Sequence, residues 1–206
     1  MTKIIVIAKS PVPGRVKTRL CPPCTPDEAA EIAQAALVDT LRAAAHVATT
    51  VVALDGQPGA WLPPDVGVVS QRGGSLDKRI AAAFEDAGAP ALLIGMDTPH
   101  VSADLLSNSI EALQQADAVL GAAEDGGWWI AGLQRSDPRA FVGVPMSKRF
   151  THEAQLRRMH ALGLRIEAVP ILRDVDTFDD ALCVAAQAPE TRFAAAVNAV
   201  AEAVSA

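Results

Sequence analysis

The sequence predicts an α/β fold, specifically a three-layer α/β/α sandwich around a mostly parallel central sheet. Apolar runs such as Ile4–Ala8 and Pro90–Gly95 are short and uninterrupted, as in strands that are buried on both faces. Segments with helical periodicity alternate with these runs along the chain, which favours a parallel sheet. The 206 residues, 50% of them hydrophobic, suffice for one sizeable core. We therefore expect a single domain over residues 1–206.

The individual elements follow from local signals. Thr25, Pro26 and Glu28 form an N-terminal capping signature, and Ser102 and Thr177 are further candidate N-caps. Strands are expected at residues 4–8, 47–54, 66–69, 90–95, 118–122, 128–133 and 165–169. Helices are expected at residues 25–45, 76–86, 102–115, 151–162, 177–186 and from 191 into the C-terminal tail. In such a fold, ligands bind beyond the carboxyl ends of the strands.

The charge distribution excludes some function classes and favours another. The net charge of −6 argues against a general nucleic-acid binder, because such proteins carry a basic surface. Yet all charged side chains before Asp27 are cationic: Lys3, Lys9, Arg15, Lys17 and Arg19. A small, highly charged anion such as a polyphosphate is a natural partner for this cluster, and a merely solubilising surface is the alternative.

The sequence also bears on membrane insertion, location and cysteine chemistry. No apolar run approaches the roughly 20 residues of a membrane span, and the run at residues 4–8 is too short for a secretory signal, so we expect a cytoplasmic protein without membrane contact. Cys21 and Cys24 lack the second pair of a structural zinc site. We expect them, and Cys183, to be structural or incidental.

The first segment that indicates chemistry is the cation loop, residues 9–20. Gly14 and two prolines form a loop in which a backbone amide could approach a phosphate. Arg15, Lys17 and Arg19 could neutralise that phosphate, the arginines through bidentate hydrogen bonds. The loop matches neither the Walker A pattern nor the dinucleotide-binding glycine pattern.

Two further segments follow predicted strands. In residues 71–79, the Gln71 amide and the backbone near Gly74 could reach the edge of a base, or the segment could be an ordinary turn before a helix. Asp97 follows the apolar strand directly. A carboxylate at that place is costly unless it is paired or bound to a metal, so Asp97 is a candidate Mg²⁺ ligand, with a simple turn before Pro99 as the alternative.

The last two segments are also acidic. Asp174 and Asp176 alternate on an extended segment and so share a side, where they could complete the metal site opposite Asp97. Residues 125–127 combine a carboxylate with two glycines. Asp125, Gly126 and Gly127 could therefore bind an acceptor molecule, although a hairpin turn would explain them equally well.

Taken together, these segments resemble the DUF2064 family of GT-A-like bacterial proteins, which is similar to the 2-phospho-lactate guanylyltransferases of coenzyme F420 synthesis. The motifs KSPVPGRVKTRL, GMDTP, DGGWW and DVDTFDD carry the resemblance, which extends from Ile4 to about Leu182. It implies a GT-A fold, that of the nucleotide-diphospho-sugar transferases, and a nucleotide-binding domain that uses Mg²⁺, with Mn²⁺ as the alternative.

The resemblance also implies roles for single residues. Arg19, accompanied by Lys17, is similar to the arginine that stabilises the triphosphate in sugar-phosphate nucleotidyltransferases. Gln71 and Gly74 resemble base-contacting residues, with Lys9, Gly14 and Arg15 as further nucleotide ligands. Asp97 and Asp176 resemble the two metal positions. The chain departs from the family pattern at Trp128, where tyrosine is usual, and at residues 146–148, where Met-Ser-Lys replaces Trp-Ser-Thr.

The leading expectation is a Mg²⁺-dependent nucleotidyltransferase that moves a nucleoside monophosphate from a nucleoside triphosphate to a small phosphorylated or carboxylate acceptor and releases pyrophosphate. A glycosyltransferase with a nucleotide-sugar donor is the alternative, although Met96-Asp97-Thr98 has only one carboxylate where such enzymes usually carry Asp-x-Asp. A nucleotide-binding module without turnover is the non-enzymatic alternative. The base, the acceptor and the oligomeric state stay open.

Overall fold

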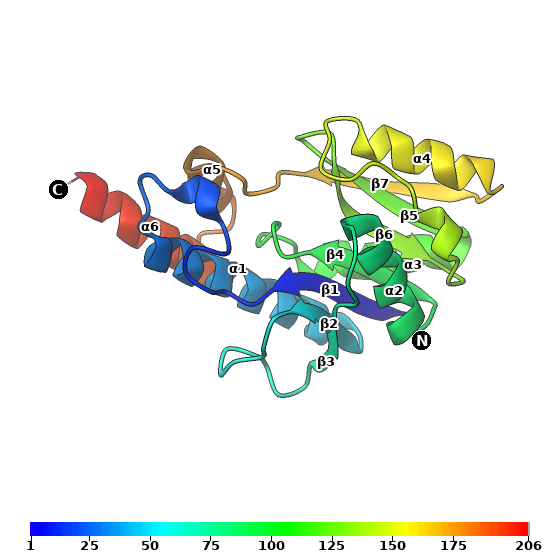
Figure 1. Ribbon diagram of the computed structural model, residues 1–206, viewed down its shortest axis with the longest axis horizontal. Helices are drawn as coiled ribbons and strands as arrows, with labels where there is room; N and C mark the ends of the chain where they lie inside the picture. The colour runs from blue at the N-terminus through cyan, green and yellow to red at the C-terminus, as the bar shows by residue number, and fades with distance from the viewer. Residues whose placement is uncertain (206) are drawn as a thin grey trace.

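The protein was analysed as a computed structural model that describes residues 1–205. Its centre is a seven-stranded sheet with strand order β3-β2-β1-β4-β6-β5-β7 (Figure 1). All neighbouring strands run parallel except β6, which is antiparallel to both β4 and β5. The strands are β1 (Lys3–Lys9), β2 (Thr50–Asp55), β3 (Gly67–Ser70), β4 (Ala91–Gly95), β5 (Ala118–Ala123), β6 (Trp128–Leu133) and β7 (Ile166–Leu172). The predicted mostly parallel sheet is therefore confirmed.

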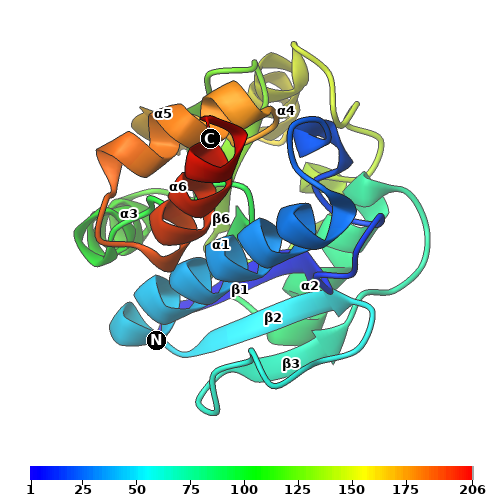
Figure 2. The same cartoon turned by 90° about the vertical axis from the view of Figure 1, so that its left-hand side faces the viewer.

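Helices cover both faces of this sheet. The helices are α1 (Pro26–Val47), α2 (Leu76–Ala87), α3 (Ala103–Gln115), α4 (Thr151–Ala161), α5 (Phe178–Gln187) and α6 (Arg192–Ser205). Helices α1 and α3 pack on one face, where α6 lies against α1 and α5 (Figure 2). Helices α2 and α4 pack on the other face. The three-layer sandwich follows from this arrangement.

The alternation of side chains along β1 explains why both faces need a cover. Ile4 and Val6 are fully buried against the core under α1 and α3, whereas Ile5, between them, is fully buried in the core under α2 and α4. Successive side chains of a strand point to opposite faces, so a strand that is apolar at every position must be covered twice.

The position of β1 also determines where a ligand can bind. Strand β1 pairs with β2 on one side and with β4 on the other. Along the sequence, β2 and β3 are added on one side of β1, and β4 is then placed on the other side of β1. Such a switch point leaves a crevice outside the carboxyl ends of the two strands. Residues that follow Lys9 and Gly95 lie at this crevice.

The boundaries differ from the predicted ones at a few places. Helix α1 continues to Val47, so β2 begins three residues later than expected. Strand β7 extends to Leu172, because it continues to pair with β5 past an irregularity near Gly121. Two short 3-10 helices, η1 (Thr18–Leu20) and η2 (Pro138–Ala140), had no sequence signal. Within residues 1–205, no helix combines the length and apolarity that crossing a membrane requires.

Candidate functional site

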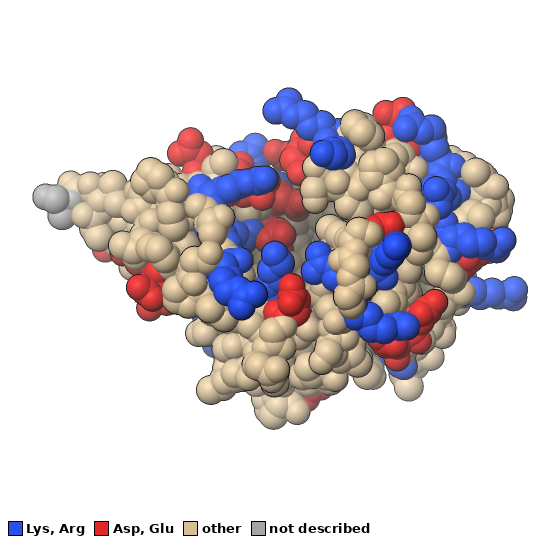
Figure 3. All heavy atoms as spheres, in the orientation of Figure 1, with Lys and Arg blue, Asp and Glu red and all other residues tan. Residues whose placement is uncertain are grey.

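The five segments that indicate chemistry in the sequence converge on one cleft of about 940 Å³ at the switch point. Figure 3 shows it as a hollow in which blue Lys and Arg side chains surround red carboxylates. The predicted site residues that line it are Lys9, Arg15, Lys17, Arg19, Gln71, Asp97, Asp125, Gly127, Asp174 and Asp176. Gly14, Gly74 and Gly126 do not line the cleft. These three glycines belong to its supporting loops, and each has a positive φ.

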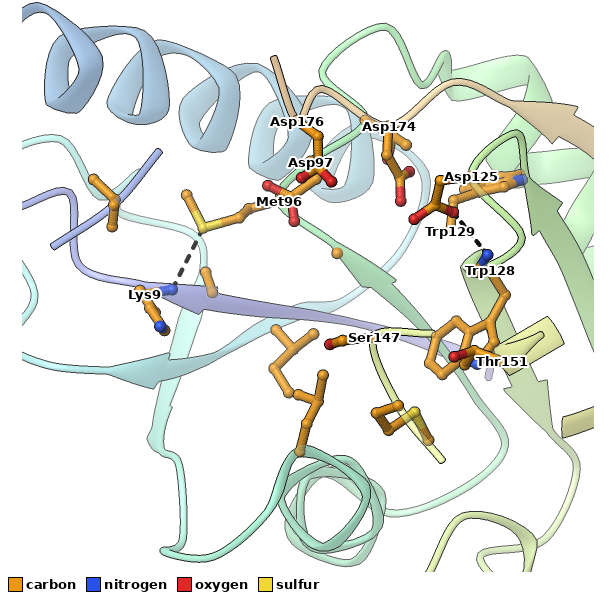
Figure 4. A pocket seen from close by; sticks show the side chains of 18 of the residues that line it. Lys9, Met96, Asp97, Asp125, Trp128, Trp129, Ser147, Thr151, Asp174 and Asp176 are labelled. Carbon is orange, nitrogen blue, oxygen red and sulfur yellow. Dashed lines mark hydrogen bonds between the residues drawn. The ribbon is translucent and has the colours of Figure 1, made fainter. Parts of the chain in front are cut away.

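Four carboxylates gather on one side of the cleft. Asp97 follows β4, Asp174 and Asp176 follow β7, and Asp125 lies in the turn between β5 and β6 (Figure 4). Asp174 Oδ1 is buried and has no hydrogen-bond partner. Burial, together with the negative charges of Asp97, Asp125 and Asp176, raises the pKa of Asp174 to about 7. Burial and the neighbouring carboxylates therefore disfavour the ionised form of Asp174.

Lys17 lies between these carboxylates. Its side chain is only 8% exposed, pairs with Asp97 Oδ1 and donates to the Val175 carbonyl. The backbone of Lys17 adopts the left-handed conformation, with φ 46°, which is uncommon outside glycine and typical of functional loops. The Val175 amide donates to the Asp97 carbonyl at 2.9 Å. Lys17 thus joins the cation loop to Asp97 and to the segment of residues 174–176.

The other cations of the loop are more accessible. Arg19 Nη1 donates to Asp176 Oδ2 at 2.8 Å, and its side chain is 73% exposed. An exposed pair of this kind contributes little to stability, so both groups can exchange partners when a ligand binds. Lys9 and Arg15 line the cleft and form no ion pair with any acid among residues 1–205.

Gln71 is held by the protein itself. Its amide nitrogen donates to the carbonyls of Ala8 and Ala53 at 2.8 and 2.9 Å, and its oxygen accepts from Arg79 Nη1 at 3.0 Å. The Gln71 side chain therefore ties β1 to β2 and holds Arg79 in the cleft. Direct contact between Gln71 and a base stays a prediction, and only the second lone pair of its oxygen is left for it.

The turn with Asp125 packs against the segment that precedes α4. The Asp125 carboxylate accepts from Gly127 N at 2.7 Å, which explains part of the Asp-Gly-Gly pattern as a local turn. Gly126 has φ 89°, and its carbonyl accepts from His152 N at 3.0 Å. A Cβ at this position would lie 1.9 Å from the Arg149 carbonyl oxygen. Glycine is therefore required for this close approach.

We expect Gly126→Ala to lower the free energy of unfolding by roughly 3 kcal/mol, because it adds a backbone clash to a left-handed strain. In thermal melts, this corresponds to a fall of about 6 to 12 °C for a protein of this size. Gly163→Ala is the matched control, since Gly163 has φ 74° but no heavy atom within 4 Å of the added Cβ. Equal melting temperatures for the two variants would contradict this account of Gly126.

Several cleft residues were not predicted as site residues. Arg79, Trp128, Lys148 and Arg149 line the cleft together with the predicted ones. Arg79 and Arg149 gave no pattern that separates them from surface arginines. Trp128 and Lys148 lie at positions where the sequence differs from what the resemblance leads one to expect, although no role was predicted for them.

The carboxylates form a suitable donor set for a divalent cation. In the conformation described for residues 1–205, no three His, Cys, Asp or Glu side chains make a ready-formed metal site. Lys17 instead neutralises Asp97. However, the buried Asp174 Oδ1 lacks any partner and faces further carboxylates, and hard oxygen ligands of this kind suit Mg²⁺ or Mn²⁺.

The cysteines lie outside this chemistry. Cys21, Cys24 and Cys183 are all free, and none lines the cleft. Burial raises the pKa of the Cys24 thiol to about 11, so it is an unreactive core group.

Comparisons with known proteins identify the family and the fold of the chain. The family model described as an uncharacterized protein conserved in bacteria (DUF2064) matches residues 30–148, more than half of the chain. No curated protein matches the sequence. A crystal structure from Desulfovibrio desulfuricans G20, provisionally assigned as a nucleotide-diphospho-sugar transferase, is similar at 28% identity and a TM-score of 0.81, over 89% of this chain and 87% of that one.

More distant structures share the fold. CMP:2-keto-3-deoxy-manno-octonic acid synthetase in complex with CTP has a TM-score of 0.55 at 14% identity, over 92% of this chain and 98% of that one. The manganese complex of Rv0371c from Mycobacterium tuberculosis H37Rv has a TM-score of 0.50 at 18% identity, over 89% and 97%. The fold is thus that of the nucleotide-diphospho-sugar transferases, and it is shared with a synthetase that binds CTP.

Proposed function

This chain belongs to the DUF2064 family of bacterial proteins, and from that membership and the chemistry of its cleft we propose that it is a divalent-metal-dependent nucleotidyltransferase. In this proposal, a small phosphorylated or carboxylate acceptor receives a nucleoside monophosphate from a nucleoside triphosphate, and pyrophosphate is released. The whole chain would form one nucleotide-binding domain.

The observation that carries the proposal is the excess of cations around a group of carboxylates at the switch point. Lys9 and Arg15 are unpaired in the described part of the chain, and Arg19 has only an exposed partner. A triphosphate with its metal presents several negative charges beyond the α-phosphate, which such a set of cations can neutralise. The distant neighbour bound to CTP supports a nucleotide ligand on this fold.

The proposed reaction is a displacement at the α-phosphorus. An oxyanion of the acceptor forms a new bond to that phosphorus, and the bond to the oxygen that bridges the α- and β-phosphates breaks. The electron pair leaves with pyrophosphate. Because the attacking oxygen is already anionic, no proton has to be removed. Arg19 and Arg15 would hold the phosphates in line and offset charge that develops on the leaving group.

Asp97 and Asp176, with Asp174, are the residues proposed to hold the metal ion. A divalent ion bound there would polarise phosphate oxygens and reduce repulsion between substrate and carboxylates. The unpartnered Asp174 Oδ1 supports this assignment. So does the manganese complex of a neighbour with the same fold. Lys17 would keep Asp97 oriented through their ion pair.

A glycosyltransferase with a nucleotide-sugar donor is the second candidate, which the assignment of the Desulfovibrio neighbour favours. The two reactions differ in the bond that breaks. A nucleotide-sugar has only two phosphates, so it leaves part of the cation set without a partner. The single carboxylate of Met96-Asp97-Thr98 also argues against a glycosyltransferase.

We expect the protein to bind a nucleoside triphosphate with Mg²⁺ at least tenfold more tightly than any nucleotide-sugar, because each charge-assisted contact to the third phosphate adds about 1.5 to 3 kcal/mol. Isothermal titration with the nucleoside triphosphates and with common nucleotide-sugars checks this ranking. Pyrophosphate release with pooled phosphorylated and carboxylate acceptors then reports turnover. Tight binding of a nucleotide-sugar without binding of any triphosphate would favour the glycosyltransferase. Binding without any turnover would favour a nucleotide-binding module.

A further inference from the structure

The side of the cleft opposite Asp97 and Asp176 is lined by a different set of groups. Trp128 of β6 and Ser147 lie there (Figure 4), and Ser147 belongs to the segment of residues 146–149, which lines the cleft and packs against the turn that contains Asp125. The cation loop follows β1, whereas this segment leads into α4. The proposed reaction uses none of these groups.

The segment before α4 is held in a fixed conformation. Thr151, which is only 4% exposed, donates its hydroxyl to the Pro145 carbonyl at 3.0 Å and accepts from the Lys148 amide at 2.9 Å. Ser147 is left-handed, with φ 57°, a conformation that persists only where the surroundings impose it. On the other side, the segment packs closely against Gly126. Lys148 is therefore presented from a rigid support.

The charges on this segment are uncompensated. Lys148 and Arg149 are exposed, line the cleft and form no ion pair with an acid in the part of the chain that the structure describes. By contrast, Arg157 on α4 and Arg139 of η2 both pair with a neighbouring acid. Lys148 and Arg149 are thus cations that face the cleft with their charge available to a ligand.

The Trp128 indole supplies a second, independent observation. Its Nε1 is buried and donates to no acceptor, although the residue lines the cleft. The ring is held from one side by Phe141, with ring centroids 6.3 Å apart. A buried indole N–H normally has a partner, so an acceptor atom is missing at this position. Because this nitrogen has almost no exposed surface, a ligand oxygen in the cleft would provide the acceptor only after a small rotation of the indole.

All three groups are donors only: the ammonium, the guanidinium and the indole N–H have no lone pair to offer. They fit an anionic oxygen group and would not favour a neutral sugar hydroxyl alone. The triphosphate already has Lys9, Arg15 and Arg19 on the other side of the cleft. We propose that Trp128, Lys148 and Arg149 form the acceptor subsite and bind a carboxylate or phosphate group of the acceptor. This inference rests on the proposed nucleotidyl transfer and assigns the residues that select its second substrate.

The subsite can be tested without knowing the natural acceptor. Protein with ¹⁵N-labelled tryptophan is titrated with methyl phosphate, acetate and phosphoglycolate, with and without Mg²⁺ and a non-hydrolysable nucleoside triphosphate. The Trp128 indole resonance is the one that disappears in Trp128→Phe. We expect it to move with at least one anion, and the first two probes show whether phosphate or carboxylate is preferred.

The charge variants provide the quantitative test. Lys148→Gln combined with Arg149→Gln should weaken binding of the preferred anion at least tenfold, while the triphosphate dissociation constant stays within about twofold. Lys78→Gln combined with Arg165→Gln is the control, because both side chains are exposed cations outside the cleft. It should change neither value. Both double variants remove exposed charges only, and their melting temperatures verify folding.

Three results would overturn the assignment. One is an unmoved Trp128 resonance with all three anions. Another is unchanged anion binding in the Lys148/Arg149 variant. The third is an equal loss of triphosphate affinity in that variant, which would assign both cations to the nucleotide. If the wild-type protein binds no triphosphate, the proposed nucleotidyl transfer fails instead, and the anion titration without nucleotide still decides whether the subsite exists.

Discussion

Asp97→Asn is expected to lower the rate of pyrophosphate release on the order of 10³-fold while leaving the fold intact. A metal-bound carboxylate contributes several kcal/mol of charge stabilisation, and an amide is a far weaker ligand. The apo structure should tolerate the change, because the amide oxygen of the variant can still accept from Lys17 and because one of several crowded carboxylates is removed. Asp176→Ala is also expected to lower pyrophosphate release while leaving the fold intact. Single-turnover assays and metal-free melts measure the two effects.

A second readout separates a ligand from a merely structural carboxylate. Mg²⁺ or Mn²⁺ should raise the melting temperature of the wild-type protein, since a ligand that binds only the folded state stabilises it. In Asp97→Asn, this rise should be lost. Asp117→Asn is the control: Asp117 is 45% exposed and pairs with Arg165, much as Asp97 is 48% exposed and pairs with Lys17, yet it lies outside the cleft. A metal-free melting temperature lowered by many degrees in Asp97→Asn would show that Asp97 supports the fold.

The fold follows from the sequence to a large extent, because each local signal agrees with the final sheet. The capping box at Thr25 and Glu28 is formed, and the one at Thr177 and Asp180 is formed as well. The order of the strands in the sheet, by contrast, could not be predicted from local signals. The insertion of antiparallel β6 between β4 and β5 depends on long-range pairing, for which an apolar run carries no direction. A single sequence therefore predicts the layers but not the neighbours of each strand.

The candidate site was likewise predictable only in part. Residues that follow a buried strand, such as Asp97, could be placed at the cleft from the general rule for α/β sheets. The interaction partner of each side chain could not be predicted in this way. Lys17 is buried against Asp97, and Gln71 turns inward to the carbonyls of β1 and β2. Both contacts depend on backbone conformations that residue types alone do not reveal.

These contacts give the cleft a definite electrostatic arrangement before any ligand binds. Lys17 is held between Asp97 and the Val175 carbonyl, so it is positioned to orient the proposed metal site. Arg19 is exposed, and its partner Asp176 is itself a proposed metal ligand. A metal ion at Asp176 would therefore compete with Arg19 for the carboxylate. The released guanidinium would then be available for the phosphates.

From this exchange of partners, we expect Arg19→Ala to lower kcat by about 10² to 10³, the scale of removing one preorganised charge stabiliser. Arg19→Lys should recover little of this loss, because an ammonium cannot form the bidentate contact of a guanidinium. The melting temperature should hardly change, since a largely exposed ion pair stabilises a fold by at most about 1 kcal/mol. Steady-state pyrophosphate assays and thermal melts on the same samples give both numbers.

Arg165→Ala is the matched control for this variant. Its side chain is 75% exposed and pairs with a half-exposed aspartate, as the 73% exposed Arg19 does, but it does not line the cleft. We expect its kcat to equal that of the wild type. If Arg19→Lys kept full turnover, the bidentate role would be wrong and a simple positive charge would suffice. If Arg19→Ala raised KM alone, Arg19 would bind the nucleotide equally in the ground state and in the transition state, and would not stabilise the reaction itself.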